Sequence, residues 1–331
     1  MRHLAQKILV GSFMLMVSQT ALALTCEVDI SPMNFGNVLP ATGSRTDAQA
    51  TANYRCRVDA FEGIDRIRLC INLGPGLAAP YNDFRSMALT GTGGDLMRYD
   101  IYSNANRRRV WGSNYHNING ARPPDITIRV PFFTSLFGGN VSGTTPLYGR
   151  VFSDNNLSSG DYLSLFSADS VRIDYGTTRQ LRNCNRPGTA QQTTTDFTVH
   201  ARVPRVCKIS ATNMNFGTVL DLNSPVNATS TVQVQCIKGT DYNLLLNPGS
   251  GVGATVEQRR MTHSDGLLSV IYELYSDPAR NNIWGQTVNV DTVPGTGSGN
   301  IQSYTVYGRL PVQPVPMTGN YRDTVVVTVR F

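Results

Sequence analysis

The sequence predicts an all-β protein made of two antiparallel β-sandwich domains. Glycine accounts for 30 of its 331 residues, whereas Asp, Glu, Lys and Arg together make up only 16%. One series of motifs occurs twice in the same order. Short stretches of alternating polar and apolar residues, separated by turns rich in Gly, Asn, Asp and Pro, are typical of antiparallel sandwiches. We therefore expect little helix.

The first 23 residues predict a secretory signal peptide. Arg2 and Lys7 precede the apolar run Ile8–Val17, and Ala21-Leu22-Ala23 is a small-x-small cleavage pattern. The apolar run is too short for a membrane span. Cleavage after Ala23 leaves a chain that begins two residues before Cys26 and is long enough for two domains.

Charge and histidine content argue against several function classes. The formal net charge is +6, and the basic residues are dispersed along the chain. A nucleic-acid partner is not expected, because such proteins cluster their positive charge. The histidines beyond the signal peptide, at positions 116, 200 and 263, have neither metal-ligand spacing nor a nucleophilic Ser or Cys partner. We expect no enzyme activity, no metal and no cofactor.

An internal repeat defines the two domains. Residues 26–39 match residues 207–220, and both segments contain Met-Asn-Phe-Gly. A Tyr-x-x-Tyr-Ser block, Trp-Gly, Tyr-Gly-Arg and a Gly-Asp-Tyr or Gly-Asn-Tyr block follow in both copies. Several anchors in one order indicate one domain used twice. The predicted division is a signal peptide (1–23), an N-terminal domain (24–192), a linker (193–203) and a C-terminal domain (204–331).

Six cysteines in an exported chain predict three disulfides. Spacing alone leaves their connectivity open, but the repeat places a second cysteine at matching distances in both copies. Zinc ligation is the alternative, but no CxxC pair or nearby histidine favours it. The expected bonds are Cys26–Cys56, Cys207–Cys236 and, from the two unrepeated residues, Cys70–Cys184.

The repeated blocks resemble the spore coat protein U family, whose secreted members are subunits of archaic (Csu-type) chaperone–usher pili. The resemblance implies two immunoglobulin-like, pilin-type sandwiches, the second lacking its last strand. It also implies the partners. A periplasmic chaperone lends the missing strand, and an outer-membrane usher exchanges it for the donor strand of the next pilin subunit.

The segment between the repeats has the pattern of such a donor strand. Its apolar residues alternate and would share one face of a strand. They are Phe197, Val199, Ala201 and Val203. We expect this segment to complete the first domain in cis. The alternative is an ordinary linker or edge strand.

The end of the sequence predicts an open edge on the second domain. Val325, Val327, Val329 and Phe331 alternate up to the last residue, and an uncovered apolar edge requires a partner. We expect the chaperone and then the next pilin to bind there. Two residues before Cys26 are too few for a donor extension, so we expect this subunit at the distal end of a fibre.

The first copy carries two apolar insertions. One lies around residues 74–84 and the other, which we expect at the distal pole, around residues 131–139. We expect their side chains to bind an abiotic or host surface; the alternative is that they fold back into the core. The candidate binding residues are Leu77, Tyr81, Phe84, Phe132, Phe133, Leu136 and Phe137.

Together these features predict the tip subunit of a surface pilus, exported through the periplasm, that mediates attachment and biofilm formation. The alternatives are a non-tip pilin of the same pili, a secreted structural coat protein of the spore coat protein U type, and a secreted lectin-like module.

Overall fold

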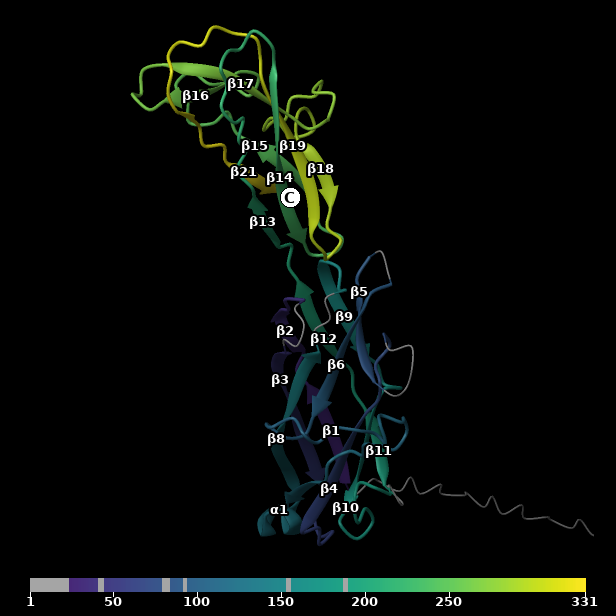
Figure 1. Ribbon diagram of the computed structural model, residues 1–331. Coiled ribbons are helices and arrows are strands. Elements are labelled where there is room, and N and C mark those ends of the chain that lie inside the picture. The colour runs from purple at the N-terminus through teal and green to yellow at the C-terminus, as the bar shows by residue number, and fades with distance from the viewer. Residues whose placement is uncertain (1–23, 41–44, 79–83, 92–93, 153–155, 187–189) are drawn as a thin grey trace, which may run out of the picture.

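The chain forms two β-sandwiches arranged end to end (Figure 1). The computed structural model describes residues 24–40, 45–78, 84–91, 94–152, 156–186 and 190–331. The predicted signal peptide, residues 1–23, lies outside these ranges. The expected all-β fold of two sandwiches is confirmed. Within the described ranges, no helix has both the length and the apolar character needed to cross a membrane.

The first sandwich contains an eight-stranded sheet in the order β1-β3-β8-β6-β5-β9-β12-β2 and a four-stranded sheet in the order β11-β10-β4-β7. Helix α1 (Phe132–Phe137) connects β7 to β8. The strands are β1 (Leu24–Ile30), β2 (Met33–Asn37), β3 (Arg45–Val58), β4 (Arg66–Leu73), β5 (Arg85–Leu89), β6 (Leu96–Tyr102), β7 (Ile126–Arg129), β8 (Gly139–Phe152), β9 (Gly160–Phe166), β10 (Val171–Thr177), β11 (Gln191–Thr194) and β12 (Phe197–Val203).

The second sandwich contains a six-stranded sheet in the order β13-β14-β19-β17-β16-β20 and a three-stranded sheet in the order β18-β15-β21. Its strands are β13 (Cys207–Ala211), β14 (Val226–Cys236), β15 (Asp241–Leu246), β16 (Arg259–His263), β17 (Ser269–Tyr275), β18 (Val293–Thr296), β19 (Gln302–Leu310), β20 (Tyr321–Arg322) and β21 (Val327–Arg330).

The repeated motifs recur because they pack against one another. In the first sandwich, a Cβ atom on Gly149 would lie 2.3 Å from the Met33 sulfur and 2.6 Å from the Phe35 ring. In the second, a Cβ atom on Gly308 would lie 2.2 Å from the sulfur of Met214. Only glycine allows this close approach. The Met-Asn-Phe-Gly and Tyr-Gly-Arg blocks therefore form one packing unit in each domain.

The tryptophans of the repeat are core residues in both copies. The indole N–H of Trp111 donates to the carbonyl of Ile71 at 2.7 Å, and that of Trp284 donates to Leu244 at 2.9 Å. Both side chains are almost completely buried. A buried indole N–H requires such a partner, so these bonds fix the ring orientation in the core.

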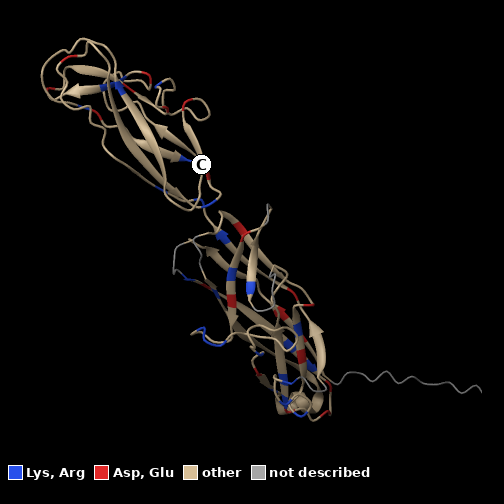
Figure 2. Ribbon diagram, turned by 45° about the vertical axis from the view of Figure 1, so that its right-hand side comes forward, with Lys and Arg blue, Asp and Glu red and all other residues tan. Residues whose placement is uncertain are grey.

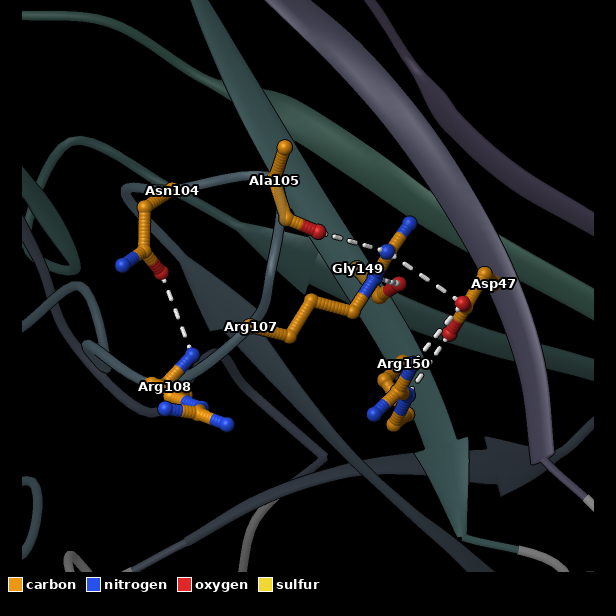
Figure 3. A network of polar contacts seen from close by, with 7 residues as sticks. All are labelled: Asp47, Asn104, Ala105, Arg107, Arg108, Gly149 and Arg150. Atoms are coloured by element: carbon orange, nitrogen blue, oxygen red, sulfur yellow. Dashed lines mark hydrogen bonds and ion pairs between the residues drawn. The ribbon is translucent and has the colours of Figure 1, made fainter.

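The arginine-rich turn at residues 107–109 is also structural (Figure 3). The Arg107 side chain donates through Nε to the Gly149 carbonyl at 3.1 Å and forms an ion pair with Asp47 at 3.3 Å. Arg150 donates to the same carboxylate at 2.7 Å, and this hydrogen bond lowers the pKa of Asp47. In the second copy, Arg280 repeats the bond to the glycine carbonyl, on Gly308 at 3.3 Å. Arg107 and Arg280 thus hold equivalent turns against β8 and β19.

Candidate interaction surfaces

The first candidate surface is the end of the first sandwich opposite the second, where α1 lies (Figure 1). The side chains of Phe132, Phe133 and Phe137 are 73%, 72% and 65% exposed. The Phe132 and Phe133 ring centroids are 5.8 Å apart, and those of Phe133 and Phe137 are 6.4 Å apart. Leu136 is half-buried. The helix carries no charged residue (Figure 2), so it presents a contiguous apolar group to solvent.

This segment forms a helix rather than the expected loop. Pro131 precedes it with φ −58°, a conformation that suits a helix start, and Gly138 ends it with φ +79°. The Gly138 amide donates to the Thr134 carbonyl at 2.9 Å. The Phe61 amide donates to the Leu136 carbonyl at 3.1 Å, which ties the helix to the turn after β3. The backbone is therefore anchored while three rings remain outside the core.

Phe61, which the sequence pattern did not indicate as a binding residue, belongs to the same end of the domain. Its side chain is 78% exposed, and its backbone has φ +64°. Residues other than glycine rarely adopt this left-handed backbone conformation. A phenylalanine in a turn was the signal that could have identified this residue. We call Phe61, Phe132, Phe133 and Phe137 the aromatic pole.

The structure does not bring the smaller insertion to the aromatic pole. Phe84 lies under the Arg98 guanidinium at 5.1 Å, and this guanidinium also lies over Phe152, the last residue of β8, at 5.8 Å. The helix of the pole lies just before the first residue of β8, whereas Phe84 lies near its last residue. A strand of 14 residues spans about 45 Å, so the two lie at opposite ends of β8. Leu77 is 64% exposed and donates from its amide to the carbonyl of Leu165 on β9. Tyr81 lies outside the described residues.

The chain contains the disulfides Cys26–Cys56, Cys70–Cys184 and Cys207–Cys236. The first and third join neighbouring strands at equivalent positions of the two sandwiches. Cys184 belongs to a loop that packs with Leu181 over the outer face of β4. The Cys184 amide donates to Asp125 at 2.6 Å. The Cys70–Cys184 disulfide therefore covers the outer face of β4, whose other face packs on the core. It does not link the two apolar insertions.

The second candidate surface becomes visible when the two copies are compared at β12. In the first sandwich β12 pairs with β9 in the antiparallel direction and with β2 in the parallel direction. Its alternating residues face the core, and the Phe197 ring stacks on Phe166 at 4.4 Å. The four side chains expected on one face are almost completely buried: Phe197 (5% exposed), Val199 (0%), Ala201 (4%) and Val203 (1%).

No strand takes the place of β12 among the described residues of the second sandwich. Strand β20, the equivalent of β9, is the outermost strand of its sheet. The second core is also less covered at the other edge of this sheet, where Ile209 of β13 is 38% exposed and its equivalent Val28 is 8% exposed. Met214 and Phe216 are half-buried, although their equivalents in the first sandwich are buried. We call the position beside β20, flanked by the segment 213–219, the open strand position.

The predicted edge residues lie in the other sheet. Strand β21 pairs with β15, and within the described chain it has no partner on its opposite side. Val325, Val327 and Val329 pack half-buried against the second core, while Phe331 is 56% exposed. Their alternation thus reflects core packing as well as an edge. In the first sandwich the equivalent strand β10 pairs with β11, so the described part of the second sandwich lacks counterparts of both β11 and β12.

Comparisons with known proteins agree with this architecture. The model of the Spore Coat Protein U domain matches residues 12–169 and 193–328. The chain belongs to this family. It is 32% identical to Protein U of Myxococcus xanthus over 160 residues, which cover 44% of this chain and 88% of that protein.

Among solved structures, the fold is similar to a chain of the CsuC–CsuE chaperone–tip adhesion subunit pre-assembly complex from archaic chaperone–usher Csu pili of Acinetobacter baumannii. The TM-score is 0.52 at 17% identity, over 93% of this chain and 100% of that one. The CupB6 tip adhesin of Pseudomonas aeruginosa matches with a TM-score of 0.38 and 12% identity, over 93% and 95% of the two chains.

Proposed function

We propose that this spore coat protein U family member is the tip subunit of a surface pilus assembled by a chaperone–usher pathway. The observation that carries the proposal is the difference between its two sandwiches. The first is completed by its own strand β12, whereas the equivalent position beside β20 is open in the second. The aromatic pole lies at the end of the first sandwich away from the second (Figure 1). One domain therefore attaches and the other joins the fibre.

The open strand position fits an extended segment with alternating apolar side chains, for which β12 is the template. Backbone pairing at the edge of β20 supplies affinity, and the apolar face supplies pockets for side chains. A periplasmic chaperone fills the position first, and the donor strand of the next pilin replaces it at an outer-membrane usher. The similar Acinetobacter structure, named as a chaperone–tip adhesion subunit complex, supports this order.

The aromatic pole serves attachment to abiotic or host surfaces, and through it biofilm formation. Burial of apolar area contributes about 25 cal/mol per Å2, so several exposed phenylalanine rings supply affinity without a shaped pocket. Neither surface calls for catalysis, and we assign the protein a structural, non-enzymatic role.

Immunogold labelling of intact cells tests the position in the fibre. Gold particles at the free ends of thin fibres are expected. Labelling along the fibres would make the chain a non-tip pilin. Labelling spread over the cell surface without fibres would contradict the pilus assignment and favour a coat protein.

A further inference from the structure

A cavity of about 680 Å³ lies beside the aromatic pole, at the end of the first sandwich where α1 lies (Figure 1). Its floor is the outer face of β1, β3 and β8, which pair side by side in the eight-stranded sheet. Thr25, Arg57 and Asn140 form one row in register across these three strands. In the next row Glu27 pairs with Arg55. All five side chains are exposed and line what we call the polar cavity.

The end of α1 also lines the polar cavity. Phe137 is the last residue of the helix, and its ring stacks on Phe133 with centroids 6.4 Å apart. Phe137 therefore belongs to both the aromatic pole and the polar cavity. A Cβ atom on Gly138 would lie 3.0 Å from the amide nitrogen of Ala60, so the helix end is packed against the turn after β3. This backbone packing holds the ring beside the polar floor.

The charges in the polar cavity balance. Arg57 has its Nε 3.7 Å from the carboxylate of Asp59, which also lines the cavity. Within the described part of the chain, the side chains of Glu27, Arg55 and Asn140 make no hydrogen bond or ion pair, so their polar atoms are available to a ligand. An anionic ligand would meet both carboxylates and a cationic ligand both guanidinium groups. The set therefore favours a neutral ligand with many donors and acceptors.

The internal repeat shows that the fold does not require these residues. At the register where Glu27 pairs with Arg55, the second sandwich pairs Lys208 with Gln235. Ile237, which follows the second cysteine of that copy, packs against the core of the first sandwich. The equivalent end of the second sandwich thus serves the junction between the domains. The polar cavity is a property of the first sandwich.

We propose that the polar cavity binds a neutral saccharide. Sugar hydroxyls donate and accept hydrogen bonds, and the cavity offers guanidinium donors, carboxylate acceptors and an amide that does both. The apolar C–H face of a sugar packs on an aromatic ring, which Phe137 supplies. The volume falls within the range of about 300–1,000 Å³ that is typical of small-molecule sites. This inference rests on the proposed function for its biological role, because a saccharide on a host surface gives the attaching domain a ligand.

The test measures saccharide binding to the full-length protein by saturation-transfer difference NMR. The neutral probes are lactose, mannotriose and chitotriose, and sialyllactose is the acidic counterpart of lactose. At least one neutral probe is expected to bind at millimolar concentration. Arg55→Gln, which copies the second sandwich, is expected to raise its Kd about tenfold by removing a charged hydrogen-bond donor. Lys208→Gln is the matched control at the equivalent register and should leave the Kd unchanged.

A second pair of variants tests the location. Phe137→Ala is expected to weaken binding about tenfold, whereas Phe132→Ala should not, because of the two only Phe137 lines the polar cavity. The melting temperature should stay unchanged in both, since both rings are exposed. Equal effects of the two variants on saccharide binding, or unchanged binding in Arg55→Gln, would overturn the assigned site.

Two outcomes would overturn the ligand class. They are binding of sialyllactose alone and failure of every neutral probe to bind. Immunogold labelling of the fibres does not depend on the polar cavity, so failure of this inference and failure of the proposed function are distinguishable.

Discussion

Lys238 of the second sandwich lies with its Nζ 3.0 Å from Oδ1 of Asp95 in the first. Oδ2 of the same carboxylate accepts from the Ser158 amide at 2.9 Å, and the Lys238 carbonyl accepts from the Ser159 amide at 2.9 Å. Ile237 packs against the core of the first sandwich. These contacts join the first and the second sandwich directly, beyond the covalent connection between β12 and β13.

The junction should loosen in acid. Burial acts to raise the pKa of Asp95, but hydrogen bonds from Ser158 and Lys238 outweigh it, so the pKa is lowered from 3.8. A group with a depressed folded pKa stabilises the fold above its unfolded pKa, and this contribution is lost as pH falls through the folded value. Small-angle X-ray scattering should show wider interdomain motion below pH 3.8 than at neutral pH.

Asp95→Asn should show this wider motion already at neutral pH, with a loss of stability of only about 0.2–1 kcal/mol because the pair is partly exposed. Asp161→Asn is the matched control, since its ion pair with Arg202 lies within the first sandwich. Identical scattering from Asp95→Asn and the native protein at neutral pH would contradict a role for the carboxylate at the junction.

Replacing the three helical phenylalanines of the aromatic pole with serine should reduce attachment without unfolding the protein. Loss of Phe132, Phe133 and Phe137 should lower retention on polystyrene about tenfold or more. The free energy of unfolding should stay within about 0.5 kcal/mol, because the side chains are exposed. Retention on the plastic and the melting temperature are the two measurements.

The matched control replaces three exposed apolar residues of the second sandwich with serine. Val252, Leu267 and Val290 are 93%, 86% and 79% exposed. An equal loss of attachment in this control would show that general hydrophobicity, rather than the pole, binds the plastic. A collapse of stability in the phenylalanine variant would place those rings in the core after all.

The sequence predicted the features that repeat or alternate. Two sandwiches followed from matched anchors, because Met33 and Gly149, distant in the chain, pack together in one copy and their equivalents do so in the other. The alternation of Phe197 to Val203 corresponds to a strand with one buried face. Such patterns are visible without coordinates, because burial on one face of a strand imposes a period of two.

Features that depend on distance in space were not predictable. Phe84 and the helix of the aromatic pole belong to the two apolar insertions, but they lie at opposite ends of β8. Phe61 is held at the pole by one hydrogen bond, from its backbone amide to the carbonyl of Leu136. No sequence pattern indicates such a bond. Strand β20 contains only Tyr321 and Arg322, too few residues for alternation, so the open strand position beside it was missed in favour of the longer pattern at Val325 to Phe331.

Introducing a charge on the buried face of β12 should destabilise the first sandwich. Val199→Asp places a carboxylate at a fully buried position and should cost about 3–5 kcal/mol. Calorimetry of the full-length protein measures the cost, and hydrogen exchange should show lost protection in β9 and β2, the neighbours of β12. His200→Asp, on the exposed face, should leave both measurements unchanged. Unchanged stability of Val199→Asp would mean that β12 is an ordinary linker.

The two Tyr-Gly-Arg glycines should respond differently to alanine, because among the described residues only the first sandwich has a strand in the position of β12. Gly149→Ala meets the fully buried Met33 and should destabilise the first sandwich by about 1–3 kcal/mol. Gly308→Ala meets Met214, which is half-buried beside the open strand position and can move outward. Its cost should therefore be below about 1 kcal/mol, and a bound donor peptide should raise it by confining Met214. The two costs are measured by chemical denaturation. Equal losses of stability in the two variants without peptide would contradict an open strand position next to Met214.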